Sequence, residues 1–272
     1  MSVRFTRFLV IGFFYQAYLH RYMIRALAVR DVQSRYVGTL GGLLWAIIHP
    51  VAIVTVFYFV FAVGFRLTLP SDVPFILWFI AGLIPWLLFN DTVLVIANSI
   101  TANAHLVKNT VFPSEVLPLV HTAASLFPHI IFLFVLLGLL IVLNVPLLGA
   151  RVLVIYYLVC TIALVCGLGW LVSSLQVFYR DISQALPVVL NIWFWSTPIV
   201  WPQTMVSEAY LGILFWNPVY YIVEGYRDAM IYDSVMWPSA VQTIYFWAIT
   251  TTFLLLGAYV FRRLKPDFAD VS

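Results

Sequence analysis

The most unusual chemical group in this sequence is an acid inside an apolar stretch. Asp91 lies in a run of apolar residues long enough to cross a membrane. An ionisable side chain at membrane depth is costly, so it is a candidate for lining a water-filled path. Its neighbour Asn90 points to a polar helix face. An equally good interpretation is that Asp91 only hydrogen-bonds a neighbouring helix.

Other reactive side chains give weaker signals. His121 and His129 are eight residues apart, so they are not metal ligands on one helical turn. Cys160 and Cys166 share one apolar run and are interpreted as core residues, not as a disulfide or a metal site. We therefore expect no catalytic residue, no metal site and no cofactor in this chain.

A phosphate-binding loop is missing from the sequence. The motif Gly-x-x-x-x-Gly-Lys-Ser/Thr does not occur, and there is no Gly-Lys dipeptide at all. The chain therefore cannot cradle the phosphates of ATP in such a loop. If its work needs ATP, a separate subunit must bind the nucleotide and its magnesium ion.

Aromatic side chains cluster within the apolar stretches. Trp and Tyr prefer the membrane interface, which explains those near the ends of a stretch but explains Trp193 and Trp195 poorly. Aromatic rings also stack on the apolar faces of sugars, so aromatic walls with few charges would suit a glycan. We predict a substrate path walled by such aromatic side chains. Its predicted lining is Trp86, Phe89, Asp91, Trp193, Phe194 and Trp195.

The elements that carry these residues must lie in lipid. The chain has 272 residues, of which 64% are hydrophobic and only 9% charged, against about 25% charged in an ordinary soluble domain. This excludes a soluble globular enzyme, a disordered chain and a nucleic-acid binder. We predict an all-α integral membrane protein forming one domain, 1–272, with six transmembrane helices within 41–261. Their expected bounds are 42–64, 75–98, 116–143, 152–175, 184–201 and 241–261.

The basic residues indicate the orientation. Eleven of the fourteen Lys and Arg fall on one side of the predicted spans, and that side is cytoplasmic by the positive-inside rule. Both termini, including the tail 262–272, are then cytoplasmic. Residues 1–40 are expected to contribute a helix, over 5–30, that lies in the cytoplasmic interface. The segment 202–240 contains Asn217-Pro218 and Glu224, and we predict a re-entrant outer hairpin between spans five and six.

Short motifs along the chain resemble a known family. Single motifs are weak, but together they occur in the family's order and cover nearly the whole chain. The motifs are Arg30–Tyr36, Gly41–Trp45 with Pro50, Gly82–Trp86, Asn103–Pro118, Val177–Ile182, Phe194–Val200 and Trp216–Pro218. On these residues, the chain resembles the membrane (permease) subunit of type-2 ABC exporters for cell-surface polysaccharides, the O-antigen, capsule and teichoic acid family.

The resemblance implies partners and a substrate. Two copies pair with two ATP-binding cassette subunits in the bacterial inner membrane, and residues 103–115 match the coupling helix that docks on the ATPase. The substrate is a glycan on a polyprenyl (pyro)phosphate lipid, moved from the cytoplasmic to the outer leaflet. The expected ATPase contacts are His105, Lys108, Phe112, Glu115, Arg180 and Asp181. The expected head-group contacts, which the positive-inside rule explains equally well, are Arg4, Arg7, Arg21 and Arg25.

Two other classes of function stay open at this point. A secondary transporter would need coupling-ion sites at mid-membrane and usually inverted repeats, which are not visible here. An intramembrane glycan-processing enzyme would need converging acids or histidines. Co-purification with an ATPase separates the exporter from both alternatives.

Overall fold

The computed structural model describes residues 12, 15–36, 41–67, 73–108, 112–145, 149–232 and 238–268. The described residues form helices and connections without a strand. Five helical segments are long and apolar enough to cross a membrane, which agrees with an integral membrane protein. They are α3 (Trp45–Tyr58, continued as a π-helix to Gly64), α4 (Phe75–Ala97), α7 (Leu117–Val142), α8 (Leu153–Gln176) and α12 (Ala240–Leu264). Each matches a predicted span to within a few residues.

The sixth predicted span, 184–201, contains a shorter helix. Helix α9 covers Ile182–Ser196, or 15 residues, which corresponds to roughly 22 Å. A bilayer core is about 30 Å thick. The helix ends where Thr197 adopts an extended conformation before Pro198, because the residue preceding a proline disfavours helical geometry. The count of six spans therefore stays a prediction.

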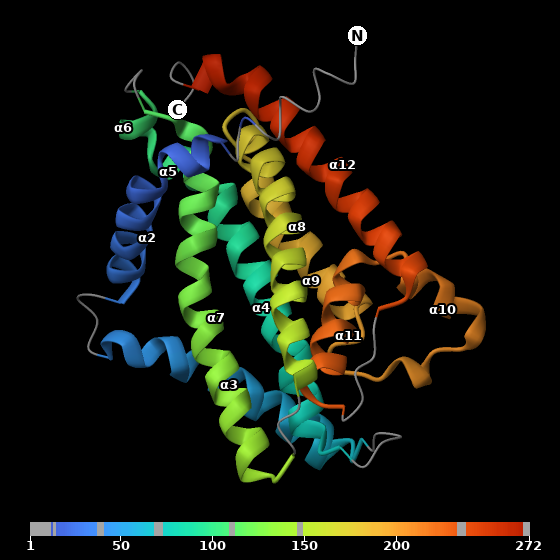
Figure 1. Cartoon of the computed structure of the whole chain (residues 1–272). Helices are drawn as coiled ribbons and strands as arrows, with labels where there is room; N and C mark the ends of the chain where they lie inside the picture. Colours follow the sequence, from blue (N-terminus) through green and yellow to red (C-terminus); the bar gives the residue numbers. More distant parts are fainter. Residues whose placement is uncertain are drawn as a thin grey trace.

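Helices α4 and α8 form the centre of the bundle, and α12 packs against α8 (Figure 1). The contact between α8 and α12 is close because glycines face each other. A Cβ atom on Gly257 would lie 2.3 Å from the carbonyl oxygen of Gly167. Small residues allow two membrane helices to approach in this way. By contrast, α3 is largely exposed and covers one side of the bundle.

Helix α2 (Arg21–Tyr36) overlaps the predicted interfacial helix over residues 21–30, whose place in a membrane surface stays a prediction. It runs beside the first half of α7 and in the same direction (Figure 1). Ala28 packs with Val120, and Tyr36 reaches Phe127, with ring centroids 6.4 Å apart. Apolar contact with α7 and an ion pair, described below, hold α2 in this position.

The segment between α9 and α12 folds into two short helices. Helix α10 (Glu208–Phe215) projects from the side of the bundle, whereas α11 (Pro218–Met230) is buried against α4 and α8 (Figure 1). They meet at Asn217, whose side chain caps α11 by accepting a hydrogen bond from the Val219 amide at 3.0 Å. Two short helices therefore occupy the segment 202–240, and the re-entrant hairpin stays a prediction.

Candidate functional site

The aromatic residues of the predicted path lie together, between α4 and α9. The ring centroids of Trp86 and Phe194 are 5.5 Å apart, and those of Phe89 and Trp193 are 5.2 Å apart. Trp195 packs edge-on against Phe194 at 5.3 Å. Trp86 and Phe89 share one face of α4 because they are three residues apart. Five of the six predicted path residues therefore belong to one aromatic cluster.

The cluster is fixed to the hairpin through a polar chain. The indole Nε1 of Trp193 donates to Asn217 Oδ1 at 2.8 Å, and Asn217 Nδ2 donates to Thr197 Oγ1 at 2.8 Å. A buried indole N–H normally finds such a partner. The same asparagine also caps α11. The end of α9 and the start of α11 are thereby joined at the aromatic cluster.

An open groove of about 240 Å³ lies beside the cluster, between α3, α4 and α9. Its described lining is aromatic, aliphatic and amide, and contains no charged side chain. Such a surface can stack on sugar rings and hydrogen-bond hydroxyls without holding them tightly. The lining residues are Ile53, Phe57, Leu83, Trp86, Leu87, Asn90, Leu94, Pro187, Leu190, Asn191 and Phe194.

Helix α9 presents a partly polar face to the outside of the chain. Gln184, Val188, Asn191 and Trp195 are exposed, and their spacing places them on one side of the helix. Polar side chains facing lipid are costly. This face is therefore better suited to water or to a second copy of the chain than to lipid.

Asp91, the sixth predicted path residue, lies apart from the aromatic groove. It lines a second cavity, of about 250 Å³, enclosed by α2, α3, α4 and α7. Asp91 is exposed at the surface of the chain, and Asn90 Nδ2 donates to its carboxylate at 2.9 Å. Residues five apart on a helix are separated by roughly 140° around its axis, so Trp86 and Asp91 point to different sides of α4.

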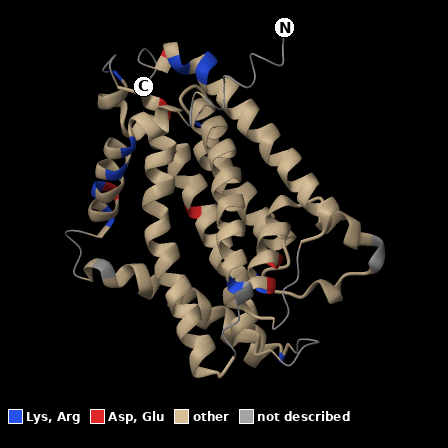
Figure 2. Ribbon diagram, in the orientation of Figure 1, with Lys and Arg blue, Asp and Glu red and all other residues tan. Residues whose placement is uncertain are grey.

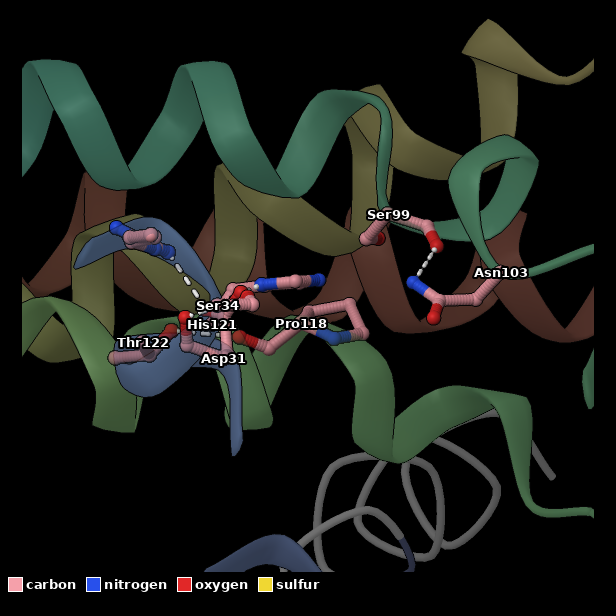
Figure 3. Close-up of polar contacts among 8 residues, drawn as sticks. Asp31, Ser34, Ser99, Asn103, Pro118, His121 and Thr122 are labelled. Carbon is pink, nitrogen blue, oxygen red and sulfur yellow. Dashed lines mark hydrogen bonds and ion pairs between the residues drawn. The ribbon is translucent and has the colours of Figure 1, made fainter. Parts of the chain in front are cut away.

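An ion-pair cluster attaches α2 to α7 (Figure 3). One carboxylate oxygen of Asp31 lies 2.7 Å from Arg35 Nη2 and 3.1 Å from His121 Nδ1. Burial raises the pKa of Asp31, but the hydrogen bonds from His121 and Arg35 outweigh it and hold this pKa below its usual range. Asp31 belongs to the motif Arg30–Tyr36, and its role here is to position α2.

Replacing Asp31 with asparagine should loosen α2. The variant loses the charge that pairs with Arg35 and His121, at a cost of about 1–3 kcal/mol for a partly buried charged hydrogen bond. Limited trypsin digestion of the purified protein should then cut faster at Arg30 and Arg35. Asp267→Asn, at an exposed position near the end of the chain, is the matched control. Equal digestion of Asp31→Asn and the native chain would contradict this role.

A fully buried arginine, Arg227, connects several elements near the start of α4. The guanidinium of Arg227, on α11, donates to three backbone carbonyls: Trp78 (3.2 Å), Pro198 (2.7 Å) and Ile199 (2.9 Å). It also donates to Glu224 Oε1 at 2.5 Å and lies 3.6 Å from the centroid of the Trp78 ring. One side chain thus connects α4, α11 and the non-helical segment after α9.

From the sequence alone, Arg227 is only one of the three basic residues that fall outside the cytoplasmic majority of eleven. Its role depends on contacts with residues 28 to 149 positions away, which no local pattern reveals. Two local signals were available: an arginine inside an apolar, aromatic helix, and Glu224 three residues before it. An ionisable residue in such a helix is expected to be paired.

The expected ATPase contacts lie at the end of the bundle where α4 and α8 finish and α9 begins. Two short helices follow α4 there, α5 (Ser99–Ala102) and α6 (Ala104–Val107). His105 within α6 and Lys108 directly after it are exposed, and Phe112 is half-buried. Arg180 and Asp181 are exposed immediately before α9. Glu115 differs, because it forms an ion pair with Lys265, with 2.5 Å between Glu115 Oε2 and Lys265 Nζ.

Two of the four expected head-group arginines can be placed. Arg21 and Arg25 are exposed on α2, and the Arg21 guanidinium lies 4.6 Å from the ring centroids of both Tyr18 and Tyr22. Arg4 and Arg7 lie outside the described residues. Basic residues gather on α2 and at the end of α12 (Figure 2).

Comparison with known proteins identifies the class of this helical bundle. Residues 22–231 match the family model of the ABC-2 type transporters. Because this match covers most of the chain, the chain belongs to that family and is a multi-pass membrane protein.

Named relatives are similar over almost their full length. The chain is 27% identical to the O-antigen export system permease protein RfbA of Klebsiella pneumoniae, over 89% of this chain and 92% of the relative. It is 25% identical to RfbA of Myxococcus xanthus, over 94% and 97%. It is 24% identical to the polysialic acid transport protein KpsM of Escherichia coli, over 87% and 92%.

Proposed function

We propose that this chain is the permease subunit of an ATP-driven exporter that moves a lipid-linked polysaccharide, similar to an O-antigen, across the bacterial inner membrane. The observation that carries the proposal is the uncharged aromatic groove between α3, α4 and α9. Membership of the ABC-2 family and the printed names of the relatives support it. The glycan is carried on a polyprenyl (pyro)phosphate and passes from the cytoplasmic to the outer leaflet.

The proposed assembly contains two copies of the chain and two ATP-binding subunits. The sequence lacks a phosphate-binding loop, so the partner subunits bind ATP and magnesium. The exposed face of α9 meets the second copy, and the glycan path runs between them. Helix α9 together with residues 197–201 completes the sixth span, which leaves both termini in the cytoplasm.

The cytoplasmic end serves two further contacts in this proposal. His105, Lys108, Phe112, Arg180 and Asp181 lie where the ATPase docks. The arginines of the N-terminal region meet the (pyro)phosphate of the lipid carrier, because guanidinium groups pair with its oxygens. These arginines are Arg4, Arg7, Arg21 and Arg25.

Replacing Trp195 with leucine tests the path. Trp195 is about half exposed and contacts Phe57 and Phe194, so leucine keeps an apolar side chain but removes the face that can stack on sugar. We expect ATP-dependent export to fall about two- to tenfold, because the loss of one aromatic contact costs about 0.5–1.5 kcal/mol. The measurement is glycan translocation into membrane vesicles containing the native ATPase. Ile192→Leu, at an exposed position on the same helix, is the control.

Two results would contradict the proposal. Unchanged export by Trp195→Leu would remove sugar stacking as the role of the cluster. Translocation without any ATP-binding subunit would favour a secondary carrier instead of an exporter.

A further inference from the structure

The second cavity, on the side of the bundle covered by α2 and α3, combines charged, polar and aromatic groups. It lies between α2, α3, α4 and α7, and Ser125 and His129 line it near the midpoint of α7. Its volume, about 250 Å³, exceeds what a single water needs, about 30 Å³. The polar and aromatic lining residues are Arg35, Tyr36, Trp45, His49, Asp91, Ser125 and His129.

Two polar groups in this cavity can form more hydrogen bonds than they do. The hydroxyl of Ser125 is buried and has no hydrogen-bond partner among the described residues. The carboxylate of Asp91 accepts from Asn90 and has room for further donors. Buried polar groups in proteins are normally satisfied, so the Ser125 hydroxyl indicates a polar occupant. The exposed Asp91 carboxylate can accept hydrogen bonds from the same occupant.

The charged side chains around the cavity indicate which kind of polar molecule it can bind. Arg35 is already paired with Asp31 at 2.7 Å, and the Asp91 carboxylate would repel a phosphate. A neutral ring with several hydroxyls suits a carboxylate acceptor, a hydroxyl and imidazoles, and the flat faces of Trp45 and Tyr36 can stack on its apolar side. A phospholipid head group lies at the membrane surface, whereas this cavity lies near the midpoint of α7.

The cavity is adjacent to the aromatic groove. Leu87 lines both. On α3, Trp45 and His49 line the cavity, and Ile53 and Phe57 continue the same stripe, with a spacing of four residues, into the groove. Helix α3 is largely exposed, so one loosely packed helix covers both spaces.

We propose that this cavity is a sugar-binding subsite, in which Asp91 and Ser125 hydrogen-bond the hydroxyls of one residue of the exported glycan. The proposal rests on the proposed function and extends it, since it adds a polar subsite next to the aromatic groove. Asp91 then has a role distinct from that of the tryptophans. Asp91 hydrogen-bonds a sugar, whereas the tryptophan rings stack on sugars.

Cysteine protection tests the occupant. His49→Cys and Ser125→Cys place thiols in the cavity, and Ile53→Cys places one in the groove as a control; the native Cys160 and Cys166 are buried. Each variant is assembled with a hydrolysis-deficient ATPase, so that translocation stalls. A small cationic methanethiosulfonate then labels membranes from cells that make the glycan and from cells lacking its first glycosyltransferase. We expect several-fold slower labelling at all three positions only when glycan is made.

The other outcomes separate the two proposals. Protection at Ile53→Cys but not at the cavity positions would overturn the subsite and leave the proposed function standing. Protection at no position would count against both. Equally slow labelling of the cavity thiols in both cell types would mean that lipid fills the cavity or that it is closed to water, and would also overturn the subsite.

A second measurement uses Asp91 itself. Asp91→Asn keeps one acceptor oxygen, and Asp91→Leu keeps none. If Asp91 binds hydroxyls, export by the leucine variant should fall about tenfold or more, with a smaller loss for asparagine and unchanged membrane insertion of both. Equal export by the two variants would overturn this role for Asp91.

Discussion

Replacing Arg227 with lysine should reduce glycan export at least tenfold and lower the thermal stability of the purified complex. Arginine satisfies three backbone carbonyls and Glu224 at once. Lysine keeps the charge but has one nitrogen, so it cannot reach carbonyls on opposite sides of the planar group. Each buried carbonyl left without a donor costs about 1–3 kcal/mol. The non-helical segment after α9 would lose its attachment to α4 and α11.

A second substitution disturbs the same contact without removing the arginine. A Cβ atom on Gly82 would lie 2.6 Å from Nη2 of Arg227, so Gly82→Ala must displace the guanidinium. Gly138→Ala is the matched control, because a Cβ atom there meets no atom within 4 Å and alanine favours a helix by about 1 kcal/mol. We expect Gly82→Ala to lower both the export rate and the melting temperature. We expect Gly138→Ala to leave both unchanged.

The pair of results decides whether the contact matters for transport or only for folding. If Gly82→Ala inserts normally and melts lower but exports at the native rate, the arginine serves stability alone. If both Arg227→Lys and Gly82→Ala behave as the native chain, the contact is dispensable. A loss of export in variants that still bind the ATPase would mean that transport requires the attachment of the segment after α9 to α4 through Arg227.

Hydropathy predicted the long helices because each of them is continuously apolar. The bounds of α4, for example, differ from the prediction by one residue. Features determined by long-range contacts were less accessible. The position of α2 depends on Asp31 meeting His121, ninety residues away. Helix α9 is short because Pro198 ends it. Hydropathy alone does not predict where a helix ends within an apolar run.

The candidate site was predictable in part for a similar reason. The clustering of Trp86 with Phe194 followed from a general expectation that aromatic side chains wall one path. The separation of Asp91 from Trp86 was available from helical periodicity alone, since five residues span roughly 140° of rotation. The role of Arg227 was not, because a charge count does not show which carbonyls a side chain will reach.

The contact between Glu115 and Lys265 leads to the last prediction. It joins the start of α7 to the end of α12, where Phe268 is buried against Phe261, with ring centroids 5.2 Å apart. Glu115 is one of the predicted ATPase contacts, and in the structure it pairs with Lys265 of the same chain. We expect Lys265→Glu to place two carboxylates together, displace the chain end and lower the amount of glycan exported per ATP hydrolysed.

Exchanging the two charges distinguishes an internal role of Glu115 from a docking role. If the pair only fixes the chain end against the coupling segment, Glu115→Lys and Lys265→Glu should each impair coupling, and the double variant should recover most of it. Coupling between residues in contact is typically about 0.5–3 kcal/mol. If the Glu115 carboxylate instead binds the ATPase, the double variant still lacks it and stays impaired. Arg263→Glu, an exposed change of the same charge, controls for electrostatics alone. Recovery in the double variant would place the ATPase contact on the exposed neighbours His105 and Lys108, because Glu115 would then be occupied inside the permease.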